Sequence, residues 1–302
     1  MQIKNIHRLL LFREDPGQKP LTLEQLQARY GIDPAGTNFY YGINEANVAD
    51  SDGLPSALGA DHRAFLNSFL SSLKASPDDE KMLMLGVEPP DDASNKNKPY
   101  AFVAAHIDLV ERLANDLAQY QQQALAAGKR MNIVVRYASE MNDGSQSQGH
   151  DPVGYKSTFV QVRHAFTTKA PKILLAFSPA LRADLPEELI AQYWPGDDYV
   201  DVISGTWYVG NNAQQAGSEA NMRAYFRHRL DKGKAFGLDE VGGCTVEAGG
   251  GNDTMLQEML HYIESLQMQK ISFRYATLFL ACKWGIDATL AFLRPKAGAA
   301  PA

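Results

Sequence analysis

Short apolar runs alternate with amphipathic stretches along the chain from about residue 80 onward. Residues 81–89, KMLMLGVEP, form an apolar run that predicts a buried strand. Residues 100–127 then repeat apolar side chains at helical spacing, and Gly128 stands where a C-terminal cap belongs. Residues 131–140, MNIVVRYASE, predict the next strand. This succession is typical of repeated βα units.

The same alternation continues through the rest of the chain. Asp151 and Pro152 form a favourable N-cap and first-turn pair for a helix that carries Tyr155 and Phe159 on one face. Two upstream runs, residues 5–12 and 39–44, add two strands to the pattern. Further strands are predicted over residues 172–179, 198–208, 234–240 and 271–280, and helices over 186–194, 219–233 and 252–269.

Eight strands with intervening helices predict a (β/α)8 barrel, a fold that carries functional groups at the C-terminal ends of its strands. A doubly wound open sheet is the main alternative, but no glycine-rich phosphate fingerprint follows any predicted strand. The run GGCTVEAGGG after Glu240 lacks the GxGxxG spacing. No linker divides the pattern, so we expect one barrel domain over residues 1–302, with the pattern weakest over residues 1–35.

Composition narrows the classes of partner. The chain has 302 residues, 45% of them hydrophobic, and a formal net charge of −6, without the basic surplus that nucleic acid or an anionic membrane surface would require. Cys244 and Cys282 have neither disulfide-scaffold nor zinc spacing and are interpreted as ordinary buried thiols. No apolar run is long enough to span a bilayer. We therefore expect a soluble protein with a neutral partner and no cofactor.

Two glutamates stand at predicted strand ends. Glu140 closes the predicted fourth strand and Glu240 the seventh, so both would open at the same mouth of the barrel. Glycoside cleavage requires two such carboxyl groups, one to protonate the leaving oxygen and one to attack or stabilise the anomeric carbon. A separation of about 5 Å predicts retention and about 6.5–9.5 Å predicts inversion. A single strand-end carboxylate, in contrast, is often only a solvated acid.

A metal-dependent hydrolase is a further alternative. Glu88, Asp91 and Asp92 in the segment VEPPDD lie near a predicted strand end and could join the other acids around a metal ion. Metal sites in barrels usually add histidines at strand ends, and the predicted strand ends carry none. We therefore expect no metal site.

Several segments resemble glycoside hydrolase family 26. RYASEMND, residues 136–143, is similar to the R...HEMNG motif of its fourth strand, and GLDEVG, residues 237–242, is similar to the nucleophile motif of its seventh. The run PGDDYVDVISGTWY resembles the stretch leading through its sixth strand, and YKSTFVQVRHAF followed by ILLAFSP resembles its preceding helix and fifth strand. The likeness covers about residues 130–245, and PGDDYVD is its most specific part.

The resemblance implies roles for individual residues. Glu140 would be the general acid/base and Glu240 the nucleophile, with Tyr208 orienting the nucleophile. Arg136 would help to keep Glu240 ionised, because an opposite charge lowers the pKa of a carboxylate. Strand alternation places Arg136 and Glu140 on one face. A purely structural ion pair is the alternative for Arg136, and Asn142 would brace the loop.

Sugar rings are held by aromatic faces and by hydrogen bonds to hydroxyl groups. Trp194 closes an amphipathic helix and is expected to pack within the barrel shell. Ser139 stands where the resembled family has a histidine, and the loop GSQSQGHD lacks the family's tryptophan. The substrate-binding residues expected are Arg136, Asn142, Trp207, Tyr208, Trp284 and His150, with the tryptophans and Tyr208 as platforms.

The sequence therefore predicts a retaining glycoside hydrolase that acts on a β-linked polysaccharide, either mannan-like or a bacterial exopolysaccharide. The alternative is a barrel that binds a polysaccharide without turnover. Ser139 and the missing loop aromatics support the alternative, whereas the two strand-end glutamates support the enzyme.

Overall fold

The computed structural model describes residues 9–12, 20–30, 33–51, 56–90, 99–144, 150–209, 212–243, 261–262, 265, 271 and 273–279. The strands are β1 (Leu9–Phe12), β2 (Gly36–Gly42), β3 (Glu80–Glu88), β4 (Arg130–Tyr137), β5 (Leu174–Phe177), β6 (Val202–Ile203), β7 (Thr206–Val209), β8 (Ala235–Gly243) and β9 (Phe273–Phe279). The helices are α1 (Leu23–Tyr30), α2 (Glu45–Ser51), α3 (Ala60–Ala75), α4 (Pro99–Ala105), α5 (Ile107–Ala126), α6 (Pro152–Lys169), α7 (Glu187–Gln192) and α8 (Asn212–Arg227), with 3-10 turns at Asp197–Tyr199 and Leu230–Lys232.

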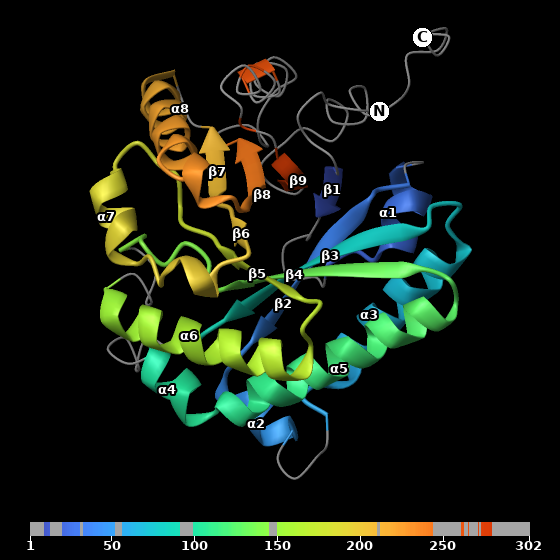
Figure 1. The fold of residues 1–302 in the computed structure, drawn as a ribbon. Coiled ribbons are helices and arrows are strands. Elements are labelled where there is room, and N and C mark those ends of the chain that lie inside the picture. Colours follow the sequence, from blue (N-terminus) through green and yellow to red (C-terminus); the bar gives the residue numbers. More distant parts are fainter. Residues whose placement is uncertain are drawn as a thin grey trace, which may run out of the picture.

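All the strands belong to one parallel, curled sheet. Its order is β1-β9-β8-β6-β5-β4-β3-β2, with β7 paired to β8, and β1 also lies against β2. Strands β6 and β7 are two pieces of the sixth barrel strand, interrupted at Ser204 and Gly205. Helices α3, α5 and α6 run along the outer face of the sheet (Figure 1). This arrangement confirms the predicted (β/α)8 fold.

Strand alternation divides the apolar side chains into two cores. Odd and even positions of a strand face opposite sides of the sheet, and burying each large aliphatic side chain contributes about 1.5–3 kcal/mol. The outer core joins the strands to the helices, as Val135 and Tyr137 of β4 do with Phe159 of α6. The inner core fills the barrel with Leu10, Met82, Met84, Val134, Ala176, Val202 and Tyr275.

Two predicted helix ends have the expected chemistry. Gly128 adopts a positive φ of 72° after α5, which is the left-handed conformation of a C-terminal cap. At the start of α6, the backbone N–H of Gly154 donates to Asp151 Oδ1 over 2.8 Å. The predicted helix over residues 100–127 is wrong at one point, because it breaks at His106 into α4 and α5. The His106 backbone leaves the helical region there, with φ −122° and ψ 34°, and its ring contacts the Phe102 carbonyl oxygen at 2.9 Å.

Other boundaries differ as well. The fourth strand ends at Tyr137 instead of residue 140, and the predicted strand over 198–208 becomes a 3-10 turn followed by β6 and β7. Helix α8 begins at Asn212 and ends at Arg227, earlier at both ends than the predicted 219–233. The predicted helix over 252–269 lies almost entirely outside the described residues.

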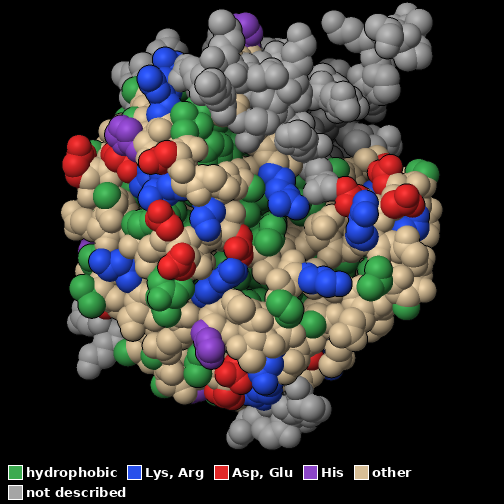
Figure 2. All heavy atoms as spheres, in the orientation of Figure 1, with side chains coloured by type: hydrophobic (Ala, Val, Ile, Leu, Met, Phe, Trp, Pro, Cys, Tyr) green, Lys and Arg blue, Asp and Glu red, His purple; other side chains and the backbone are tan. Residues whose placement is uncertain are grey.

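Charged side chains of both signs are interspersed over the face shown in Figure 2. None of the described helices has the length and apolar character needed to cross a bilayer.

Candidate active site

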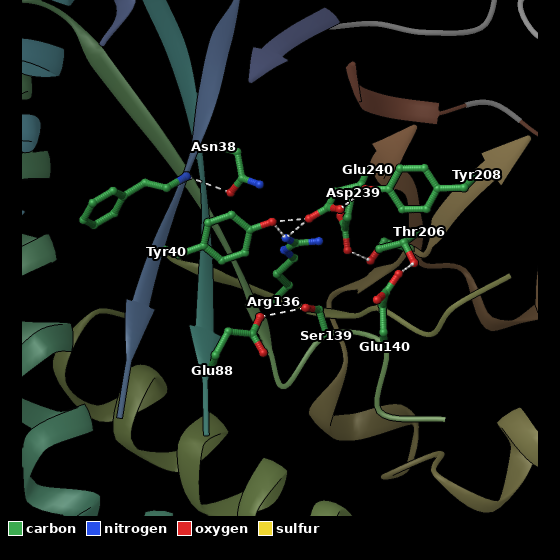
Figure 3. Close-up of polar contacts among 12 residues, drawn as sticks. Asn38, Tyr40, Glu88, Arg136, Ser139, Glu140, Thr206, Tyr208, Asp239 and Glu240 are labelled. Carbon is green, nitrogen blue, oxygen red and sulfur yellow. Dashed lines mark hydrogen bonds and ion pairs between the residues drawn. The ribbon is translucent and has the colours of Figure 1, made fainter. Parts of the chain in front are cut away.

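Four strands bring polar side chains to the mouth of the barrel. Tyr40 from β2, Arg136 from β4, Tyr208 from β7 and Glu240 from β8 point toward one another (Figure 3). Register explains the meeting, because Gly86 of β3 pairs with Tyr40 on one side and with Arg136 on the other. Residues in register on neighbouring parallel strands lie side by side across the sheet, so Tyr40 and Arg136 flank Gly86.

Both carboxylate oxygens of Glu240 accept hydrogen bonds. Arg136 Nη2 and the Tyr40 hydroxyl donate to Oε1, and the Tyr208 hydroxyl donates to Oε2. Arg136 Nη2 also donates to the Tyr40 oxygen, which closes a triangle of contacts. Arg136 is fully buried and Glu240 is 8% exposed. The site therefore holds one carboxylate in a fixed orientation with a cation beside it.

A β-bulge directs Glu240 into the barrel. Leu238 pairs with Ala276 and Val241 with Leu278, so two residues of β8 oppose the single residue Thr277 of β9. Leu238 and Val241 pack in the outer core. The two residues between them, Asp239 and Glu240, both reach the interior, where regular alternation would have turned one of them outward.

Asp239, Tyr275 and Ser204 form a buried polar cluster below Glu240. Its two carboxylate oxygens accept hydrogen bonds from the Tyr275 hydroxyl and from Ser204 Oγ, each at 2.6 Å. Burial raises the pKa of Asp239, while Arg136 and the hydroxyl donors act in the opposite direction. The Asp239 side chain thereby links β8 to β9 and to the interruption between β6 and β7.

Glu140 reaches the mouth from a tight turn. Ala138 and Glu140 have positive φ angles of 48° and 57°, an uncommon conformation for residues other than glycine. The turn is tied to β3 and to the residue that follows β5, since Ala138 N–H donates to Val87 O and Glu140 N–H donates to Ser178 O, each at 2.9 Å. The prediction that alternation aligns Glu140 with Arg136 is therefore wrong, because the strand ends before Glu140.

Thr206 lies between the two glutamates. Its Oγ1 hydroxyl donates to Glu140 Oε1 over 2.6 Å, and its backbone pairs in register with Glu240 (Figure 3). The two carboxyl groups therefore open at the same mouth, with Thr206 joining them although β4 and β8 are not neighbours in the sheet.

The surroundings of the two glutamates shift their pKa values in opposite directions. Burial raises the pKa of Glu140, and the neighbouring charge of Glu240 raises it further. Burial also acts to raise the pKa of Glu240, but the Arg136 guanidinium and the hydrogen bonds from Tyr208 and Tyr40 outweigh it and lower that pKa. Two titratable groups pushed apart in this way suit a proton donor beside an ionised partner.

Three of the predicted substrate-binding residues, Trp207, Arg136 and Asn142, do not face the open space of the mouth. Trp207 is fully buried against Tyr262, with ring centroids 5.5 Å apart, and presents no face to a sugar. Its neighbours Thr206 and Tyr208 face the mouth, so alternation turns Trp207 toward the outer core. Arg136 is also fully buried, and among the described residues its side chain donates hydrogen bonds to Glu240 and Tyr40.

Asn142 braces a loop instead of facing the mouth. Its Nδ2 donates to the Ala180 carbonyl oxygen over 3.0 Å and its Oδ1 accepts from the Ala180 N–H over 2.8 Å. Tyr208 contacts Glu240, as the resemblance implied. His150 is exposed immediately before α6, and Trp284 lies outside the described residues. Trp194 packs in the shell with its ring 5.0 Å from Phe177.

The acids considered for a metal site are only partly described. Asp91 and Asp92 lie outside the described residues. Across the part of the chain that the structure covers, no group of three or more His, Cys, Asp or Glu side chains is arranged to hold a metal ion.

Sequence reasoning missed four residues of the mouth: Tyr40, Glu88, Thr206 and Asp239. Alternation in FYYGIN carried a signal for Tyr40, because Phe39 and Tyr41 join the outer core and leave Tyr40 on the inner face. The sequence marks Glu88 only as a possible metal ligand. No sequence signal marks the bulge that brings Asp239 inward.

The fold and the residues at the mouth can be compared with the architecture that the sequence resemblance implies. A parallel (β/α)8 barrel with glutamates after the fourth strand and on the seventh is the architecture that the resemblance to barrel glycosidases implies. No family model and no curated protein matches the sequence. Comparison of the fold, however, finds many similar solved structures.

The chain has the fold of the family 26 mannanases. It is 15% identical to a modular endo-β-1,4-mannanase from Cellulomonas fimi, with a TM-score of 0.69 over 98% of this chain and 72% of that one. It is 16% identical to a family 26 β-mannanase from Bacteroides ovatus, with a TM-score of 0.64 over 96% and 89%. It is 13% identical to a family 26 protein from Muricauda sp., with a TM-score of 0.69 over 97% of this chain and 87% of that one.

Proposed function

We propose that the protein is a retaining glycoside hydrolase that acts on a mannan-like, β-linked polysaccharide. The observation that carries this proposal is the pair Glu140 and Glu240, which share one barrel mouth and have pKa values shifted in opposite directions. The fold shared with family 26 mannanases supports both the reaction and the class of sugar.

The proposed first step forms a covalent glycosyl-enzyme. Glu140 donates its proton to the glycosidic oxygen while a carboxylate oxygen of Glu240 attacks the anomeric carbon and the leaving sugar departs. In the second step Glu140, now ionised, takes a proton from water, and the resulting hydroxide displaces Glu240 from the sugar. Arg136, Tyr40 and Tyr208 keep Glu240 ionised and oriented for its attack in the first step, and they stabilise the carboxylate that departs in the second.

Hydrolysis of a panel of plant and microbial polysaccharides, including β-1,4-mannan, tests the proposal. We expect reducing ends to be released from mannan by the wild type, with losses of about 10²–10⁴-fold or more in Glu140→Ala and Glu240→Ala. Proton NMR of the first product should show retained anomeric configuration. Inverted product would contradict the double displacement, and full activity of both variants would contradict the assignment of the pair.

A second candidate function is polysaccharide binding without turnover. It is favoured by one observation: both oxygens of Glu240 already accept hydrogen bonds, which makes the carboxylate a weaker nucleophile. Binding to the panel without hydrolysis by the wild type would establish this function in place of the enzyme.

A further inference from the structure

Glu88 is a third carboxyl group at the same mouth. It is the last residue of β3 and stands on the same strand face as Gly86, whose register partners are Tyr40 and Arg136. Glu88 therefore lies one inward position closer to the opening than Arg136 does. It keeps some exposed surface, in contrast to the fully buried Arg136.

The glycine below Glu88 makes room for its carboxyl group. A Cβ atom on Gly86 would lie 2.6 Å from the Tyr40 ring and 3.2 Å from Glu88 Oε1. The carboxyl group is thus folded over Gly86 and lies beside the ring that also contacts Glu240.

The hydrogen-bonding capacity of Glu88 is only partly used. Ser139 Oγ donates to Oε1 over 2.7 Å (Figure 3), and no other described residue donates a hydrogen bond to this carboxyl group. An ionised carboxylate has about four acceptor positions. The open positions therefore lie at the exposed end of the side chain, next to the proposed catalytic pair.

The electrostatic surroundings place Glu88 in the same site. Burial raises the pKa of Glu88 to about 7, with the charges of Glu240 and Glu140 adding to the rise and Arg136 and Ser139 opposing it. All three charged neighbours belong to the mouth. A hydroxyl group that donates to this carboxylate would relieve its loss of hydration.

We propose that Glu88 binds a hydroxyl group of the sugar unit next to the cleaved bond, with Ser139 holding its carboxylate in place. This inference rests on the proposed function and assigns a substrate contact to a residue outside the two catalytic glutamates. The competing explanation is that Glu88 only braces the turn that carries Glu140, through Ser139.

Binding to an inactive parent separates these explanations. In a Glu240→Gln background, the dissociation constant for β-1,4-mannohexaose is measured by isothermal titration calorimetry. We expect Glu88→Ala to weaken binding about 10- to 100-fold, the range for a lost hydrogen bond to a charged group. Glu88→Gln, which keeps the size of the side chain, should weaken binding less than Glu88→Ala, because its amide oxygen still accepts a hydrogen bond, although more weakly than a carboxylate does. Ser139→Ala should also weaken binding less than Glu88→Ala does.

Glu80→Ala is the matched control, since Glu80 lies at the opposite end of the same strand and contacts Arg130 and Asn132. It should leave the dissociation constant unchanged. If Glu88→Ala matches this control, or costs no more than Ser139→Ala, the inference about Glu88 is wrong and the proposed function stands. If the parent itself does not bind the hexasaccharide, the proposed substrate fails and this inference with it.

Discussion

Glu140 and Glu240 carry the same functional group in different surroundings. Glu240 accepts hydrogen bonds from three side chains, one of which is the buried cation Arg136. Among the described residues only Thr206 donates to the Glu140 carboxyl group, which also lies near the negative charge of Glu240. An enzyme that needs Glu240 ionised loses activity as pH falls through its lowered pKa. The same enzyme needs Glu140 protonated and loses activity as pH rises through its raised pKa.

The pH profile of kcat/KM should therefore be bell-shaped. Thr206→Val removes the hydroxyl that lowers the pKa of Glu140, so the alkaline limb should move to higher pH while the acid limb stays in place. The measurement is initial rate against pH for the wild type and the variant on one soluble substrate. A shift of the acid limb alone would show that the two roles are exchanged.

Chemical rescue tests the same assignment independently. Azide should restore part of the activity of Glu240→Ala, because the small anion can occupy the space of the missing nucleophile. Glu140→Ala should keep activity on aryl glycosides whose leaving group needs no proton. Rates with and without azide, on activated and unactivated substrates, provide the check. Rescue of neither variant would mean that the pair is misassigned.

At the scale of elements, the turn after β4 determines where Glu140 lies. The apolar pattern predicted the strand, but strand alternation could not describe residues that adopt positive φ angles. That conformation is imposed by hydrogen bonds to Val87 on β3 and to Ser178 immediately after β5. Local sequence therefore predicts the strand, and long-range contacts decide the placement of its last side chain.

Asn142 allows a direct test of this turn. Asn142→Ala leaves the N–H and C=O of Ala180 without their buried partner, so we expect the free energy of unfolding to fall by about 1–3 kcal/mol. Loss of the brace should also lower kcat more than it raises KM, since Glu140 is misplaced while the other strand ends remain. Urea unfolding and steady-state kinetics provide the two measurements. An unchanged kcat in a destabilised variant would show that the brace serves stability alone.

At the scale of the whole molecule, the barrel interior changes from apolar to polar toward its mouth. The periodicity of the sequence predicts the eight strands and the apolar residues between strands and helices. It does not predict which strand-end side chains meet, because Tyr40 and Glu240 are brought together only by closure of the sheet. The error at Trp207 was avoidable, since assigning Tyr208 to the mouth already implies the opposite face for its neighbour.

Asp239 connects this polar layer to the stability of the barrel. It is fully buried and accepts hydrogen bonds from Ser204 on the loop after β6 and from Tyr275 of β9. Asp239→Ala leaves both hydroxyl groups without this acceptor and removes a negative charge near Arg136. We expect the free energy of unfolding to fall by about 1–3 kcal/mol, the cost of leaving the buried Tyr275 hydroxyl without its acceptor, because Ser204 Oγ can still donate to the Phe177 carbonyl oxygen at 3.1 Å.

The matched control is Asp184→Ala, because the Asp184 side chain is 63% exposed and pairs with Arg182 at the surface. Its free energy of unfolding should change by less than about 0.5 kcal/mol. Urea unfolding followed by circular dichroism compares the two variants, and Tyr275→Phe in the Asp239→Ala background measures their coupling. If the hydrogen bond carries the effect, the second substitution should cost little once Asp239 is gone. An equal cost of Tyr275→Phe in both backgrounds would instead mean that the two side chains stabilise the barrel independently.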